Sequence, residues 1–157
     1  MTRARKVELD CEAPFAVAAA LVVEVRTAEV FEQASGVLDL DDVERVHDMR
    51  VATRRLRAAL EIFEPVFPCK RHRKALKRVK ALADALGERR DLDVEIERLE
   101  DLADDVVDED RDALASLIGG LRAGQLQAND ALAPFVSAKR VKKLRRRLAR
   151  LVEGVET

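Results

Sequence analysis

The sequence contains no tryptophan and no tyrosine, and only five phenylalanines. Proteins that grip single-stranded nucleic acid stack bases on aromatic side chains, so this scarcity argues against that class of function. Two cysteines, Cys11 and Cys69, are too few for a disulfide framework or a zinc site. Long apolar runs are missing too, because the longest, residues 15–23, is far too short to span a bilayer.

Glycine and proline are also scarce, at six and four of 157 residues, whereas Ala, Leu, Val, Arg, Asp and Glu dominate. This profile is typical of an all-α protein. The charged fraction of 38% is high, but the hydrophobic fraction of 48% favours a folded core over disorder. The length fits one domain, so we assign residues 13–157 to a single domain preceded by a flexible segment, residues 1–12.

The few helix-breaking residues predict where the helices end. Gly36 is placed to stop the first helix, Pro65 the second, and Pro134 the fourth, whereas Gly87 interrupts or kinks the third. We expect helices over about residues 15–34, 42–64, 70–106, 109–133 and 137–151. Short connections imply antiparallel neighbours, hence an up-and-down antiparallel bundle of four long helices plus a C-terminal basic helix.

The net charge of −1 conceals strong segregation of charge along the chain. Residues 45–80 carry a net charge of +9, residues 84–112 carry −10, and residues 137–150 hold eight basic residues and no acid. A ligand meets these local fields rather than the overall pI. The acidic stretch is either solvated surface or a counter-charge for the last helix, whose Lys139, Lys142, Lys143 and Arg146 either bind a ligand or pair with those acids.

Basic and imidazole side chains follow one another along one face of the second helix. At 100° per residue, four side chains fall within about 80° of one another: His47, Arg50, Arg54 and Arg57. We call them the His47–Arg57 stripe. Like charges one turn apart repel by a few tenths of a kcal/mol per pair, and a face meant only for solubility would mix in acids. The unmixed stripe therefore suggests that an extended anion supplies the missing charge.

The third helix repeats this two-faced pattern. Its basic side groups Lys70, Arg73, Lys74, Lys77 and Lys80, opposite an apolar side. If the second and third helices form a hairpin, their basic stripes lie side by side as a continuous cationic groove. The competing interpretation, a solvated helix face with local ion pairs, is weakened by the scarcity of acids over residues 45–80.

Two segments resemble the motifs of a known family. Residues 46–63, VHDMRVATRRLRAALEIF, closely resemble the signature helix of the CHAD family, the conserved histidine α-helical domains. Residues 76–94, LKRVKALADALGERRDLDV, resemble that family's second motif. The resemblance implies a helical fold whose basic surface binds inorganic polyphosphate, often in proteins associated with polyphosphate granules.

Carried over residue by residue, the resemblance implies a set of phosphate-binding side chains. They are His47, Arg50, Arg54, Arg55, Arg57, Lys74, Lys77, Arg78, Arg89 and Arg90, which Lys70 and Arg73 of the third-helix stripe extend. Asp91 is expected to orient an arginine or to cap the resumed helix. The family's usual domain has two helical bundles, so this shortened form is expected to recover the second wall of its groove by pairing with another copy as a homodimer.

The sequence offers no sign of catalysis. It has no P-loop, no cluster of metal-binding side chains and no nucleophile–base arrangement, so we expect a non-enzymatic module without cofactor or metal. The cysteine content and the absence of a signal-peptide pattern favour a cytoplasmic protein that does not bind membranes. The alternatives are a general polyanion or nucleic-acid surface and a scaffold bundle, and the scaffold leaves the repelling stripe unexplained.

Protonation of His47 is favoured by a polyanion bound beside it, so we expect polyphosphate to bind more tightly at about pH 5.5 than at about pH 8. His47→Ala should lose this pH dependence and keep the binding that the arginines provide. Calorimetric titration of both proteins across that pH range measures the effect. Identical pH profiles for wild type and variant would refute the role of His47.

Overall fold

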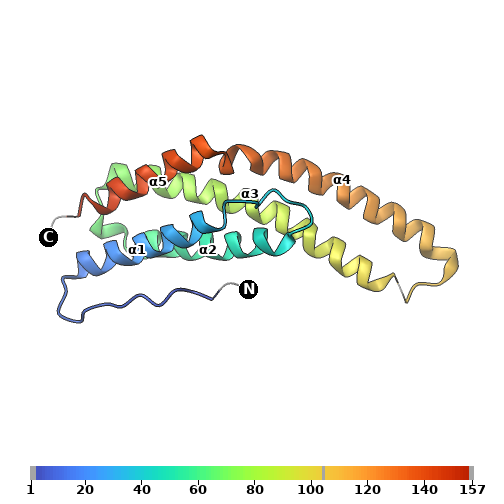
Figure 1. The fold of residues 1–157 in the computed structure, drawn as a ribbon, viewed down its shortest axis with the longest axis horizontal. Helices are drawn as coiled ribbons and strands as arrows, with labels where there is room; N and C mark the ends of the chain where they lie inside the picture. The colour runs from blue at the N-terminus through green and yellow to red at the C-terminus, as the bar shows by residue number, and fades with distance from the viewer. Residues whose placement is uncertain (1–2, 104, 156–157) are drawn as a thin grey trace.

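The computed structural model describes residues 3–103 and 105–155, which form a helical bundle without strands (Figure 1). The long helices are α1 (Phe15–Glu32), α2 (Val43–Ile62), α3 (Cys69–Leu102), α4 (Arg111–Val136) and α5 (Ala138–Val152). Two short 3₁₀ turns, η1 (Glu64–Val66) and η2 (Asp108–Asp110), precede α3 and α4. The predicted all-α bundle is confirmed. None of the described helices is long and apolar enough to cross a membrane.

Two predicted helix boundaries are wrong. Gly87 does not interrupt the third helix, because the 34-residue α3 runs through it without a break. Its buried neighbours Leu86 and Arg89 hold that turn in place, which outweighs the cost of about 1 kcal/mol for glycine in a helix. Pro134 lies inside α4, and the break falls at Ser137, whose backbone is extended (φ −60°, ψ 144°). The extended Ser137 separates α4 from α5.

The direction of α5 decides which surfaces meet. Helices α1, α2 and α3 alternate in direction, and α4 returns along α3 (Figure 1). After Ser137 the chain keeps the direction of α4, so α5 continues along the first half of α3 and also packs on α1 (Figure 1). Helix α5 therefore continues the course of α4 and does not reverse direction to form a further antiparallel helix.

The core is built from the apolar sides that the periodicity predicted. Met49 and Leu56 of α2 are buried in the same core cluster as the apolar residues of α3, so the face opposite the His47–Arg57 stripe packs inward as expected. His72 is buried as well, stacked on Phe67, with its Nε2 2.7 Å from the Leu60 carbonyl oxygen. This histidine joins the end of α2 to the start of α3 and is not exposed to ligand.

The N-terminal segment, expected to be flexible, lacks helix and strand over residues 3–13. It is nevertheless tied to α1 at Arg5. The Arg5 backbone N–H donates to Glu29 at 2.6 Å, and Arg26 donates to the Arg5 carbonyl oxygen at 3.0 Å. The Arg5 side chain also pairs with Glu32.

A buried polar cluster joins α3, α4 and the loop between α1 and α2. The Arg89 guanidinium is fully buried and donates to Asp93 at 2.9 Å and to Asn129 at 2.8 Å. Gln125 donates to the same Asp93 oxygen at 2.6 Å. Asn129 in turn donates to the Leu38 carbonyl oxygen at 3.0 Å. Because a buried charge is tolerated only when it is paired and hydrogen-bonded, the cluster sets how α4 lies on α3.

This cluster corrects two expectations about the second motif. Arg89 is predicted to contact phosphate, but its guanidinium is buried and committed to Asp93 and Asn129, so it does not reach a surface ligand. Asp91 is predicted to orient an arginine or to cap a resumed helix. That orienting role belongs to Asp93, and α3 is unbroken there, so it needs no cap. Arg90 is half-buried beside the cluster.

Removing one partner of the buried Arg89–Asp93 pair should lower the free energy of unfolding much more than removing one partner of an exposed ion pair. We expect Arg89→Met to lower the free energy of unfolding by about 3–5 kcal/mol, because Asp93 is left buried and unpaired. Adding Asp93→Leu should recover more than half of that loss. Urea unfolding followed by circular dichroism measures both values.

The matched control is the exposed pair of Arg122 with Glu100. Arg122→Met should cost less than about 1 kcal/mol, because solvent screens that pair. Equal losses for Arg89→Met and Arg122→Met would show that the buried cluster does not hold α4 to α3.

Candidate functional site

Four basic residues of α5 form a second stripe. Arg140, Lys143, Arg147 and Arg150 follow one another at steps of three, four and three residues, the same spacing as the His47–Arg57 stripe. At 100° per residue they lie within about 80° of one another. The stripe borders the side of α5 that packs inward, so it lies where α5 meets its neighbours and not on the outermost face of the helix.

Helix α3 offers a matching set of cations on the flank that faces α5. Arg71, Lys74 and Arg78 are spaced by three and four residues and are exposed. They border the buried residues Ala75 and Leu82. They lie on the opposite flank from Lys80, which reaches toward α2. The cations of α3 therefore extend around its exposed side from the α2 boundary to the α5 boundary.

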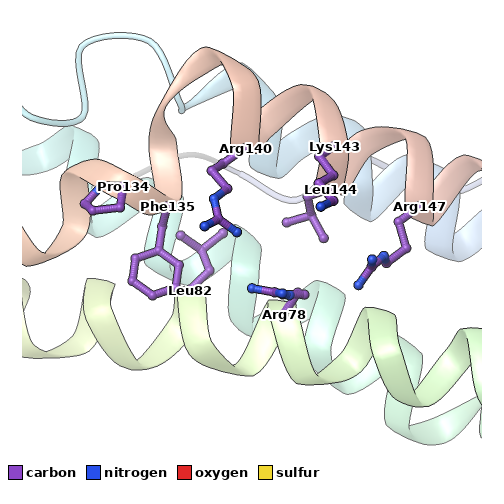
Figure 2. A pocket seen from close by; sticks show the side chains of 8 residues that line it. All are labelled: Arg78, Leu82, Pro134, Phe135, Arg140, Lys143, Leu144 and Arg147. Carbon is purple, nitrogen blue, oxygen red and sulfur yellow. The ribbon is translucent and has the colours of Figure 1, made fainter.

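The two sets meet because α3 and α5 run antiparallel (Figure 1). One cavity is lined by Arg71, Lys74, Arg147 and Arg150, together with Glu153 and Gly154. A second is lined by Arg78, Arg140, Lys143 and Arg147, together with four apolar residues. Figure 2 shows the guanidinium groups of Arg78, Arg140 and Arg147 turned toward the space between the helices. We call these seven cations the α3–α5 seam.

The seam is electrostatically unbalanced. Within the described part of the chain, none of its seven cations forms an ion pair, and Glu153 is the single acid lining the two cavities. Arg147 lines both cavities and donates to the Lys74 carbonyl oxygen at 3.3 Å. Facing cations without counter-charge raise the free energy of the empty site, and a bound anion relieves that repulsion.

Of the four candidate residues of the last helix, Lys143 belongs to the seam and the other three lie next to it. Lys139, Lys142, Lys143 and Arg146 line a shallow hollow on α5 that Arg147 and Arg150 also border. The positive surface thus continues from the seam around the exposed side of α5. Among the described residues, no group of three His, Cys, Asp or Glu side chains is placed to hold a metal ion.

The carboxylate of Glu61 joins α2 to α3 at the boundary where the sequence predicts a cationic groove. Glu61 accepts from Arg57 at 3.1 Å and from the Lys80 ammonium at 3.0 Å. The hydrogen bonds from Lys80 and then Arg57 lower the pKa of the Glu61 carboxyl below its usual range. Arg57 is therefore already partly neutralised, and an anion must compete with Glu61 for it.

The rest of the His47–Arg57 stripe meets the acidic half of α3. Because α2 and α3 are antiparallel and Arg57 and Lys80 share Glu61, the start of the stripe lies level with the stretch of α3 that follows Lys80. There Asp84 and Asp91 occupy the same flank as Lys80. Arg50, Arg54 and Arg55 form no ion pair with any described residue, and His47 is half-buried. These four residues remain candidates, in a weaker positive field than the sequence implies.

Four seam residues were missed by the sequence-based prediction, namely Arg71, Arg140, Arg147 and Arg150. The three-four-three spacing on the last helix was readable from the sequence and is the signal that would have found three of them. Their position opposite α3 was not readable, because it depends on α5 continuing in the direction of α4. Of the predicted residues, the seam brings together Lys74, Arg78 and Lys143, while Lys70, Arg73 and Lys77 lie exposed on the adjoining surface of α3.

Comparison with known proteins gives one match. The family model for the CHAD domain matches residues 22–156, nearly the whole chain. No curated protein and no solved structure matches the chain significantly. The matched range includes the His47–Arg57 stripe, the buried Arg89 cluster and every residue of the α3–α5 seam.

The paired Glu61 should make stability pH-dependent. Its folded-state pKa is lowered, so its contribution is present above the unfolded-state pKa and is lost as pH falls through the lower folded-state pKa. Glu61→Gln should therefore lower the free energy of unfolding at neutral pH, by less than about 1 kcal/mol because the carboxyl is exposed and screened. The difference from wild type should disappear in strong acid, as urea unfolding at stepped pH would measure.

The control is Glu64→Gln, which removes a nearby exposed acid that forms no ion pair with another described residue. Its effect should be small at every pH. A Glu61→Gln deficit that persisted unchanged into strong acid would show that packing, and not charge pairing, is what the substitution disturbs.

Proposed function

The chain belongs to the CHAD family, and on that premise we propose that it is a non-enzymatic module that binds inorganic polyphosphate. Binding runs along the α3–α5 seam and across the exposed side of α3 toward Arg57. The observation that carries the proposal is the seam itself, in which seven cations, none of them ion-paired with a described residue, face one another across two antiparallel helices. The family's association with polyphosphate supports the same ligand.

The chemistry of the seam suits a linear phosphate polymer. Arginine presents a planar fork that grips two oxygens of one phosphate, and lysine supplies a compact charge. Five of the seven seam cations are arginines. From Arg140 to Arg150 the α5 stripe advances by about 15 Å along the helix axis, so successive side chains meet successive phosphates of an extended chain.

The His47–Arg57 stripe extends this surface on the other side of α3. Arg57 and Lys80 become available when an anion displaces Glu61, and Arg50 and Arg54 follow along α2. A polymer that occupies the seam first is held at high effective concentration beside this second patch. The seam therefore anchors the polymer, and the stripe that the motif emphasises lengthens the contact.

Two further features belong to the proposal. The face of the polymer turned away from α3 and α5 is covered by a second copy of the chain, which gives a homodimer. The protein is cytoplasmic and collects at polyphosphate granules, because binding to the polymer recruits it there. Nucleic acid is the competing ligand, and the lack of tryptophan and tyrosine for base stacking disfavours it.

A charge-neutralising triple variant tests the seam. Lys74→Gln/Arg147→Gln/Arg150→Gln should weaken long-chain polyphosphate binding at least about tenfold, because three phosphate contacts are lost. The slope of log K against log salt should fall by about two, since each neutralised phosphate contributes about 0.7 for a single-stranded polyanion. Calorimetric titration at about 50 and 200 mM salt measures both quantities.

The matched control removes the same charge from exposed sites on the acidic half of the molecule, with Arg98→Gln/Arg111→Gln/Arg122→Gln. At about 200 mM salt, where the Debye length is below about 8 Å, screening should keep its affinity within about twofold of wild type. Equal losses in the two triple variants would mean diffuse attraction and would refute the seam. Equal affinity for duplex DNA would reduce the function to general polyanion binding.

A further inference from the structure

One of the two seam cavities is lined by apolar side chains as well as by cations. Four apolar residues line it, Leu82 of α3, Pro134 and Phe135 of α4 and Leu144 of α5. Four cations surround them, Arg78, Arg140, Lys143 and Arg147. Figure 2 shows the Phe135 ring and the Leu82 and Leu144 side chains on the same opening into which the guanidinium groups of Arg78 and Arg140 turn.

This lining differs from that of its neighbour. The adjoining cavity of the seam is bordered by Arg71, Lys74, Arg147, Arg150, Glu153 and Gly154 and contains no large apolar side chain. An inorganic phosphate chain has no apolar part, so it gains nothing from Phe135 or Leu144. A pocket with an apolar floor and a few convergent charged groups is typical of sites for organic ligands.

We propose that this pocket binds the heterocyclic end of a nucleoside polyphosphate, whose phosphates then lie in the seam. The inference rests on the proposed function for the phosphates and goes beyond it for the base. Guanidinium groups and phenylalanine rings both stack on heterocycles, and Arg78, Arg140 and Phe135 supply both kinds of surface in one pocket.

The volume of the pocket, and the fact that it shares Arg147 with the neighbouring cavity, fit a ligand whose base lies in the pocket and whose phosphates lie outside it. The pocket encloses about 160 Å³, less than the 300–1,000 Å³ of sites that enclose a whole drug-sized molecule. It therefore takes a single ring system and leaves the phosphates outside. Arg147 lines both this pocket and its neighbour, so a phosphate chain leaving the base passes Arg147 toward Lys74 and Arg71.

Comparing ATP with inorganic tripolyphosphate tests the inference on the unmodified protein, without magnesium. Both carry three phosphates, but ATP has one fewer ionisable oxygen, so charge alone favours tripolyphosphate. We expect ATP to bind about five- to tenfold more tightly, because base stacking adds to the phosphate contacts. Adenosine should bind at least about a hundredfold more weakly than ATP. Calorimetric titration of all three ligands measures these ratios.

Two substitutions then locate the base. Phe135→Leu keeps an apolar side chain in the core but removes the ring, and should cancel the advantage of ATP while leaving tripolyphosphate binding unchanged. Phe135→Ala should act the same way, with folding verified by circular dichroism. The control Phe15→Ala removes an exposed ring at the start of α1, outside the pocket, and should leave both affinities unchanged.

The outcomes separate the two proposals. ATP binding no tighter than tripolyphosphate, or an ATP advantage that survives Phe135→Leu, would overturn the base pocket and leave the polyphosphate seam standing. An ATP advantage that needs Phe135, in a protein that fails to bind long-chain polyphosphate, would support the pocket and overturn the proposed function. Failure to bind any of these anions would overturn both.

Discussion

One fully buried guanidinium, that of Arg89, determines how α4 packs on α3. Arg89 has no access to solvent, so α4 must bring Asn129 to it and Gln125 to its partner Asp93. These hydrogen bonds restrict both the rotation of α4 and its height along α3. Because α5 is joined to α4 through Ser137 and keeps its direction, the position of α5 beside the first half of α3 follows from the same cluster.

The seam exists because apolar packing outweighs charge repulsion. Leu148 and Leu151 of α5 are fully buried, and each contributes about 1.5–3 kcal/mol by leaving water. A like-charged pair on a helix surface costs only a few tenths of a kcal/mol. The apolar side of α5 can therefore hold its arginines against those of α3. The repulsion between the facing cations remains as an unfavourable electrostatic contribution to the free energy of the folded state.

The acids of this nearly neutral chain do not cancel that field. The acidic half of α3 and the start of α4 extend away from α5 (Figure 1). Their ion pairs among the described residues are local, such as Arg111 with Asp108 and Arg122 with Glu100. No ion pair between described residues joins the acidic stretch to α5, so the interpretation of those acids as a counter-charge for the last helix is wrong. The charges are therefore segregated along the bundle, with the cations of α3 and α5 at one end and most of the acids at the other.

Local patterns in the sequence determined the helices, their apolar sides and the basic face of each helix. Periodicity is a property of neighbours along the chain, so the inward packing of Met49 and Leu56 and the positive character of the third helix were predictable. The two motifs predicted the family to which the chain belongs. The effect of Gly87 was not predictable, because distant packing outweighed a local preference.

Only the tertiary structure decided which basic faces meet. In the sequence, Arg89 looks like one more exposed cation of a motif. Its burial depends on Gln125 and Asn129, which lie 36 and 40 residues further along the chain. The pairing of Lys74 with Arg147 depends on the direction that the chain takes after Ser137. Composition and spacing determine the charge that each helix carries. Which of those charges face one another is set by long-range packing, which no local pattern encodes.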